Sequence, residues 1–208
     1  INVKKEFSPK EKTQYKFLLN VLGFLFSNIL LENNNQIDFR DLYFTSAKSR
    51  VANMVSYALE KSKINVPKEI MNMFVRCRKF MLMKDASQFS ATKKLISEFE
   101  NQGIDNLLVK GQFIKDTYPQ PDFRVTNDVD VHIKSKDIEK ARTILSSLGY
   151  RIIESTDDLI VAVQDPFVQF EIHCDNGNFR NSTFTENLFS NANLVDNTNH
   201  TYKFTDEY

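Results

Sequence analysis

The chain has 208 residues, which is enough for one large domain or two small ones. It is 41% hydrophobic and 26% charged, a composition typical of a globular protein with a sizeable core. Its 27 basic and 27 acidic residues give a net charge of zero, which argues against a generic binder of long nucleic acid, since such proteins normally carry a basic excess.

No stretch of sequence approaches the ~18 consecutive apolar residues of a membrane span. The basic start of the chain leads into an acidic helix opening and not into a cleavage site, so we expect no signal peptide and a cytoplasmic location. Cys77 and Cys174 stand far apart without the spacing of metal ligands. We therefore predict two buried thiols in a protein that does not depend on disulfides.

The N-terminal half has the periodicity of helices. Ser8, Pro9 and Glu11 form a helix start with a capping box, followed by an apolar stripe at helical spacing. A second helix is predicted over about 46–62, and a third begins at Pro67 and ends near Gly103, which would serve as its C-terminal cap.

After Gly103 the pattern changes to short strands and turns. Strands are predicted over 107–109, 128–133, 151–154, 159–163 and 167–174. Between them we predict a short helical segment up to Thr117, a proline-containing loop over 118–124, and a helix over 136–147 that is closed by Gly149. The tail from Asp175 reads as loop with one short helical piece over 186–191. We predict an α+β fold, with a helical region over 1–102 and a mixed β-sheet with flanking helices over 103–208.

Acidic residues recur on one face of two of these strands. Alternation places Asp128 and Asp130 on the same side, roughly 7 Å apart, and Glu171 and His173 together on the second strand. If the strands are neighbours, three carboxylates converge with no Lys or Arg in either strand to neutralise them. A divalent cation would relieve the repulsion, so a metal site is the first hypothesis. The alternative is a solvated edge of an amphipathic strand.

These parts stand in an order that resembles the DNA polymerase β-like nucleotidyltransferase superfamily. The sequence is most similar to a bacterial family of uncharacterised nucleotidyltransferases, and the similarity rests on the following segments: Val109-Lys110-Gly111, Tyr118-Pro119-x-Pro121-x-x-Arg124, Asn127-Asp128-Val129-Asp130-Val131, Leu148-Gly149-Tyr150 and Glu171-Ile172-His173. Together these segments reach from about Asn106 to Cys174.

The resemblance implies a metal-dependent enzyme that transfers the NMP group of an NTP such as ATP to a hydroxyl acceptor. In that reading Asp128, Asp130 and Glu171 are the catalytic residues and hold two Mg²⁺ ions, or Mn²⁺. The nucleotide-binding residues implied by the resemblance are Lys110, Gly111, Gln112 and Arg124, with Gly111 letting the backbone approach the triphosphate.

His132 and His173 share the face of the carboxylates. They are candidates for orienting the carboxylates, or for binding Mn²⁺ or Zn²⁺ directly. Gln112 stands where the superfamily often has Gly or Ser, and the sequence ends at Tyr208, where the family pattern predicts more helix, so the domain is expected to be truncated at its C-terminus.

Two other functions remain open at this stage. One is a glycosyltransferase that uses Asp128 and Asp130 to bind a metal and a nucleotide-sugar, although no long βαβ series precedes them. The other is a non-catalytic nucleotidyltransferase-like domain for binding or regulation. If the protein is a nucleotidyltransferase, the expected acceptor is a small molecule, a protein or an RNA end.

Overall fold

The computed structural model describes residues 7–27, 30–31, 37–62, 64–109, 115–124, 126–174 and 188–204. The chain divides into two compact units, residues 1–83 and 84–208, and each is considered by itself. The long helix α4, Lys68–Asn101, contributes its first half to one unit and its second half to the other. Residues 84–101, which the sequence division placed in the helical region, therefore belong to the same compact unit as the sheet.

The first unit consists of helices. α1 (Pro9–Ser27), α2 (Phe39–Lys48), α3 (Ala52–Lys61) and the start of α4 enclose a core of buried apolar side chains that includes Val21, Leu42, Val55, Ala58 and Phe74. The capping box at the start of α1 is confirmed, because the Glu11 amide donates to Ser8 Oγ at 3.3 Å and the Ser8 amide to Glu11 Oε2 at 2.8 Å.

The prediction of one helix over 46–62 was wrong. The segment begins in α2, turns at Arg50 with a φ of 60°, and continues as α3. The start of α2 has a local cause: the Asp38 side chain accepts hydrogen bonds from the Arg40 and Asp41 amides, each at 3.1 Å. An aspartate followed three residues later by another acid is a recognisable helix start. The helix that follows Asp38 is short, so its apolar residues form too brief a pattern to predict it.

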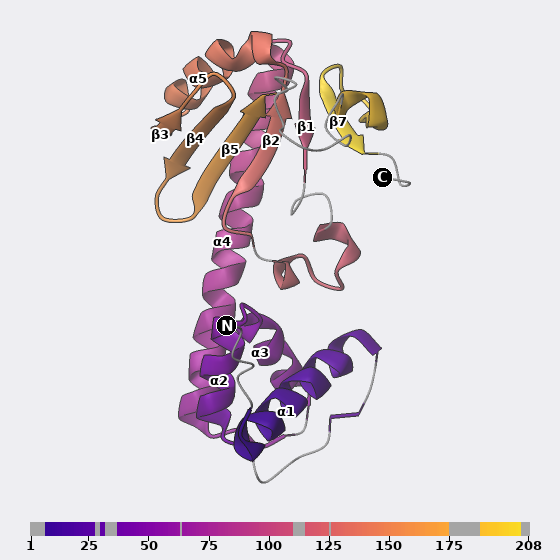
Figure 1. Ribbon diagram of the computed structural model, residues 1–208, viewed down its shortest axis with the longest axis vertical. Coiled ribbons are helices and arrows are strands. Elements are labelled where there is room, and N and C mark those ends of the chain that lie inside the picture. Colours follow the sequence, from indigo (N-terminus) through magenta and orange to yellow (C-terminus); the bar gives the residue numbers. More distant parts are fainter. Residues whose placement is uncertain are drawn as a thin grey trace, which may run out of the picture. The chain divides into compact units, whose positions relative to one another are not determined.

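The second unit is a seven-stranded mixed sheet with the order β3-β4-β5-β2-β1-β7-β6 (Figure 1). The strands are β1 (Asn106–Leu108), β2 (Val129–Ile133), β3 (Arg151–Ser155), β4 (Leu159–Gln164), β5 (Val168–Cys174), β6 (Ala192–Leu194) and β7 (Thr201–Phe204). β2 runs parallel to β5 and β1 parallel to β7, whereas the other pairs are antiparallel. The predicted α+β class is confirmed.

One face of this sheet is covered by helices. Leu95 and Phe99 of α4, together with α5 (Ile138–Ser147), pack against fully buried side chains of β2 and β5, namely Val129, Val131, Ile133, Phe170 and Ile172. Because side chains alternate along a strand, Asp130, His132, Glu171 and His173 point to the opposite face. Both predicted glycine caps are found in the left-handed region, Gly103 at φ 67° and Gly149 at φ 84°.

The sequence predicted a tail of loop with one short helical piece, but the tail also contains two strands. The predicted helical piece is seen as a short 3₁₀ turn, Leu188–Asn191, but β6 and β7 extend the sheet beside β1. The Asn106 amide donates to the His200 carbonyl at 2.8 Å, and the Asn106 side chain to the same carbonyl at 3.1 Å. These partners lie far away in sequence, so no local pattern could reveal them.

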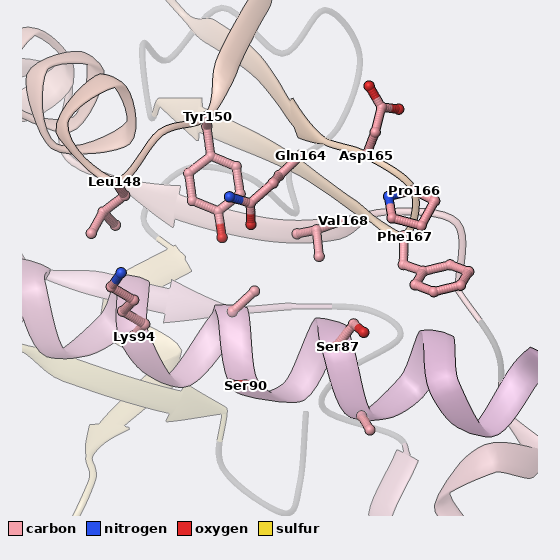
Figure 2. A pocket seen from close by; sticks show the side chains of 12 residues that line it. Ser87, Ser90, Lys94, Leu148, Tyr150, Gln164, Asp165, Pro166, Phe167 and Val168 are labelled. Atoms are coloured by element: carbon pink, nitrogen blue, oxygen red, sulfur yellow. The ribbon is translucent and has the colours of Figure 1, made fainter.

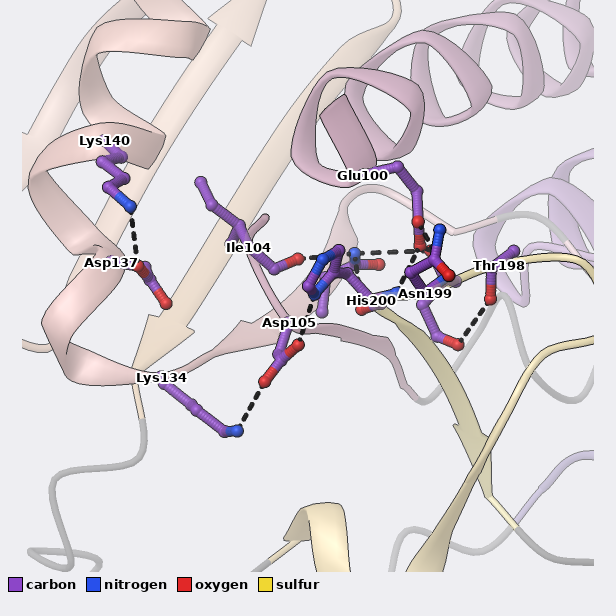
Figure 3. A network of polar contacts seen from close by, with 11 residues as sticks. Glu100, Ile104, Asp105, Lys134, Asp137, Lys140, Thr198, Asn199 and His200 are labelled. Atoms are coloured by element: carbon purple, nitrogen blue, oxygen red, sulfur yellow. Dashed lines mark hydrogen bonds and ion pairs between the residues drawn. The ribbon is translucent and has the colours of Figure 1, made fainter. Parts of the chain in front are cut away.

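A polar network at the end of α4 fixes this tail (Figure 3). Glu100 accepts hydrogen bonds from the amides of Asn199 and His200, both at 3.0 Å, and from the Thr201 hydroxyl. Burial works against the charged form, but these hydrogen bonds prevail and lower the pKa of Glu100. Asp105 behaves alike: burial opposes its ionisation, yet its contacts with Lys134 and His200 lower its pKa.

These shifts predict an acid-sensitive attachment of the tail. A carboxyl group whose folded pKa is lowered stabilises the fold above its unfolded pKa, and this contribution is lost as the pH falls through the folded pKa. We expect Glu100→Gln to reduce the free energy of unfolding by about 1–2 kcal/mol at pH 7, the range for hydrogen bonds to a charged group. The difference from wild type should shrink towards pH 3 in urea titrations.

Glu98→Gln is the matched control, because it removes the same charge from a nearby position on the same helix. It should change stability little at either pH. An equal loss for Glu100→Gln at pH 7 and pH 3 would contradict a charge-based attachment.

Candidate metal site

The site forms where β2 and β5 lie side by side. Their parallel register pairs Asp130 with Glu171 and His132 with His173. Paired residues on neighbouring strands lie about 5 Å apart, and both members of each pair point to the same face. The two strands that carry the predicted carboxylates are therefore neighbours in the sheet.

The side chains of Asp130, Glu171 and His173 converge. His173 Nε2 lies 3.2 Å from Asp130 Oδ1 and 3.7 Å from Glu171 Oε2, and one ligand atom from each residue lies within 4.8 Å of the others. Gln169 Nε2 donates to Glu171 Oε1 at 3.1 Å, which leaves the other carboxylate oxygen of Glu171 facing the cluster. Two carboxylates and an imidazole thus form a donor set of a size that a single divalent cation can use.

Burial makes this arrangement costly without a counter-charge. The side chain of Asp130 is 6% exposed, and those of Glu171 and His173 are 25% and 20% exposed. At about 5 Å and an effective dielectric constant of about 20, two like charges repel by about 3 kcal/mol. Carboxylate oxygens suit Mg²⁺ or Mn²⁺, and an imidazole in the set favours Mn²⁺ or Zn²⁺ over Mg²⁺.

The donor set differs from the trio expected from sequence. Asp128 is half-buried just before β2 and is not a member of the group of three, whereas His173 is. His132 stacks on His173, with ring centroids 5.1 Å apart and planes inclined by 21°. The sequence left two roles open for His173, orienting the carboxylates or binding Mn²⁺ or Zn²⁺ directly, and its ring nitrogen lies within reach of both carboxylates of the group.

The segment that carries Asp128 is held by α4. Gln88, which is 1% exposed, donates from Nε2 to the carbonyls of Thr126 at 3.3 Å and Asn127 at 3.4 Å. Lys84, one turn earlier, donates to Asn127 Oδ1 at 3.3 Å. Buried carbonyls need a partner, so Gln88 fixes the backbone immediately before Asp128. Gln88 could not be recognised from the sequence, because nothing local distinguishes a buried glutamine from an exposed one.

The predicted nucleotide-binding residues are only in part within the described chain. Lys110, Gly111 and Gln112 lie outside the described residues, but Val109 donates its amide to the Asp130 carbonyl at 3.3 Å, so the chain enters that segment beside Asp130. Arg124 is half-buried, and its Nε atom is buried without a hydrogen-bond partner among the described residues. A buried guanidinium nitrogen in that state can still donate to an anion.

A mixed sheet with carboxylates gathered on adjacent central strands is a fold and site suited to metal-assisted transfer of phosphate groups. Comparison with known families agrees: a model described as uncharacterised nucleotidyltransferase matches residues 35–207, and the chain belongs to this family. No curated protein and no solved structure matches the chain. None of the described helices is both long and apolar enough to cross a membrane.

The cluster predicts metal binding that depends on Asp130. Asp130→Asn keeps the shape of the side chain but removes its charge. We expect the affinity for Mn²⁺ to fall at least about tenfold, a loss typical of mutations at residues that support a metal site. Isothermal titration of the metal-free protein with Mn²⁺ measures this. Glu154→Gln, on exposed β3, is the control that removes one negative charge elsewhere. Equal weakening by both variants would indicate a general charge effect and no site.

Gln88→Leu tests whether α4 positions the start of β2. The change removes the hydrogen bonds to the two carbonyls but keeps a similar volume, so the free energy of unfolding should fall by about 1–3 kcal/mol. If Asp128 takes part in metal binding, Mn²⁺ affinity should fall as well. Gln102→Leu, at an exposed position after α4, is the control and should alter neither quantity.

Proposed function

We propose that this protein is a metal-dependent nucleotidyltransferase that moves the NMP group of an NTP to a hydroxyl acceptor. The acceptor oxygen forms a bond to the α-phosphorus, the bond from that phosphorus to the bridging oxygen breaks, and pyrophosphate leaves. The observation that carries the proposal is the pairing of Asp130 with Glu171 across the parallel strands β2 and β5. Membership of the nucleotidyltransferase family supports it.

The donor set fits a divalent cation. Asp130 and Glu171 would hold it together with His173, and Asp128 would contribute to a second ion in the two-metal arrangement that the family resemblance implies. Bound there, Mg²⁺ or Mn²⁺ would neutralise charge on the phosphates and favour loss of the acceptor's proton. The burial of Asp130 strengthens these electrostatic effects, because the site is partly removed from water.

The protein's own groups have separable roles. Glu171 is the more exposed of the two carboxylates, and we assign to it the role of taking the proton of the acceptor hydroxyl. Gln169 orients it through the hydrogen bond to Oε1. Arg124, whose Nε atom has no partner within the described part of the chain, would donate to phosphate oxygens, and Lys110, Gly111 and Gln112 would bind the triphosphate as the family pattern predicts.

The remaining parts of the proposal concern the surroundings of the reaction. The acceptor is a small molecule, a protein hydroxyl or an RNA end, and the zero net charge disfavours a long nucleic acid. ATP is the first nucleotide to test. A cytoplasmic location, a bacterial origin and a place in the DNA polymerase β-like superfamily stay predictions from the sequence.

Thermal melting with metal and nucleotide tests the activity class. We expect the melting temperature to rise with Mg²⁺ or Mn²⁺ plus an NTP by more than the sum of the separate shifts, because a ligand that binds only the folded state stabilises it by mass action. Asp128→Asn with Asp130→Asn should abolish the joint shift, whereas Glu154→Gln should retain it.

Other outcomes identify the alternatives. A shift specific to UDP-sugars with metal would indicate a glycosyltransferase and contradict the proposal. A protein that binds neither NTP nor UDP-sugar in the presence of metal would instead be a non-catalytic member of the family. A retained joint shift in the double variant would contradict the assignment of the site.

A further inference from the structure

A polar cavity lies in the sheet unit, on the face of the sheet opposite to the candidate metal site. It has a volume of about 460 Å³ and is bounded by α4, by Tyr150 before β3, and by the turn between β4 and β5 (Figure 2). Its wall on α4 is built from small side chains, including Ser87 and Ser90. A volume of this size suits a small molecule, for which sites of about 300–1,000 Å³ are usual.

Tyr150 brings an unused donor to this cavity. The residue is 7% exposed, and its ring is anchored edge-on against Phe170, with centroids 5.2 Å apart. Its hydroxyl is directed towards α4 (Figure 2) and makes no hydrogen bond with the described part of the chain. The hydroxyl oxygen is not one of the fully enclosed polar atoms, so it can be reached from the cavity. Burial raises the pKa of Tyr150, so the phenol stays protonated and able to donate.

The charges around the cavity select an anion. Lys94 is the one cationic side chain among the described residues that line the cavity. Asp165 also lines the cavity, but its carboxylate points away from it (Figure 2) and lies 3.6 Å from Arg151 Nη2. Gln164 adds an amide beside the Tyr150 ring. The cavity therefore presents an ammonium group, a phenol, an amide and two hydroxyls, next to the apolar side chain of Phe167.

We propose that this cavity binds a small hydroxylated organic anion, with Lys94 on its phosphate or carboxylate group and Tyr150, Ser90 and Gln164 on its hydroxyl or carbonyl groups. The cavity is distinct from the metal site. Val168, which lines it, has the same parity on β5 as Phe170 and Ile172, whereas Glu171 and His173 have the other parity. Binding here goes beyond the proposed nucleotidyl transfer and requires no divalent cation.

Amide NMR of the full chain without divalent metal tests the proposal. Ribose 5-phosphate, glucose 6-phosphate, citrate and inorganic phosphate are titrated at constant ionic strength. We expect saturable shifts of amides in 87–94 and 164–168 with at least one organic anion. Lys94→Gln should weaken binding at least about tenfold, the effect of losing a hydrogen bond to a charged group. Tyr150→Phe should weaken it several-fold while preserving the ring packing.

Lys93→Gln is the matched control, since Lys93 is the neighbouring lysine on the same helix, is exposed like Lys94, and does not line the cavity. Lys93→Gln should bind the organic anions like wild type. Asp130→Asn should do so as well, so the test of the cavity does not depend on whether the proposed metal site is correct. The response of phosphates compared with citrate tells which anionic group is preferred. Absence of saturable shifts with every organic probe, equal binding of inorganic phosphate, or equal losses in Lys93→Gln and Lys94→Gln would overturn the proposal.

Discussion

The structure depends on the parallel pairing of β2 with β5, which forces two carboxylates together on one face of the sheet. Their repulsion, of about 3 kcal/mol at an intermediate dielectric constant, opposes this register. The opposite face supplies the compensation, because Val129, Val131, Ile133, Phe170 and Ile172 are all fully buried there, and each such side chain contributes about 1.5–3 kcal/mol. A slip by one residue would expose this whole set, so the apolar face fixes the position of the acids.

Helix α4 organises the sheet unit through side chains spaced along its second half. Gln88 holds the backbone before Asp128, Leu95 and Phe99 fill the core under β2 and β5, and Glu100 binds the tail that becomes β7. Each contact acts on a different segment of the chain. A single rigid helix thus relates the start of β2, the core and the added strands to one another, which gives the site a preorganised support.

What could be predicted from sequence was what has a local cause. The alternation in β2 and β5, the capping box at Ser8 and the glycines at 103 and 149 depend on neighbouring residues, and all were found as expected. The strand β7 was missed because its partner in the sheet is β1, which lies about a hundred residues away in sequence, and β6 joins the sheet only by pairing with β7. The composition of the donor set was also non-local, since it follows from which residues of two strands are paired.

The presence of His173 among the carboxylates changes how the site is expected to discriminate between metals. An imidazole is a poor partner for Mg²⁺ but a good one for Mn²⁺ or Zn²⁺, whereas carboxylates accept all of them. His132 stacks against His173 and limits the rotation of its ring, so the imidazole is held at the cluster and cannot easily swing into solvent. Because β2 and β5 fix these rings by the same register that fixes the carboxylates, the charge of the cluster and the proposed preference for Mn²⁺ or Zn²⁺ arise from one structural constraint.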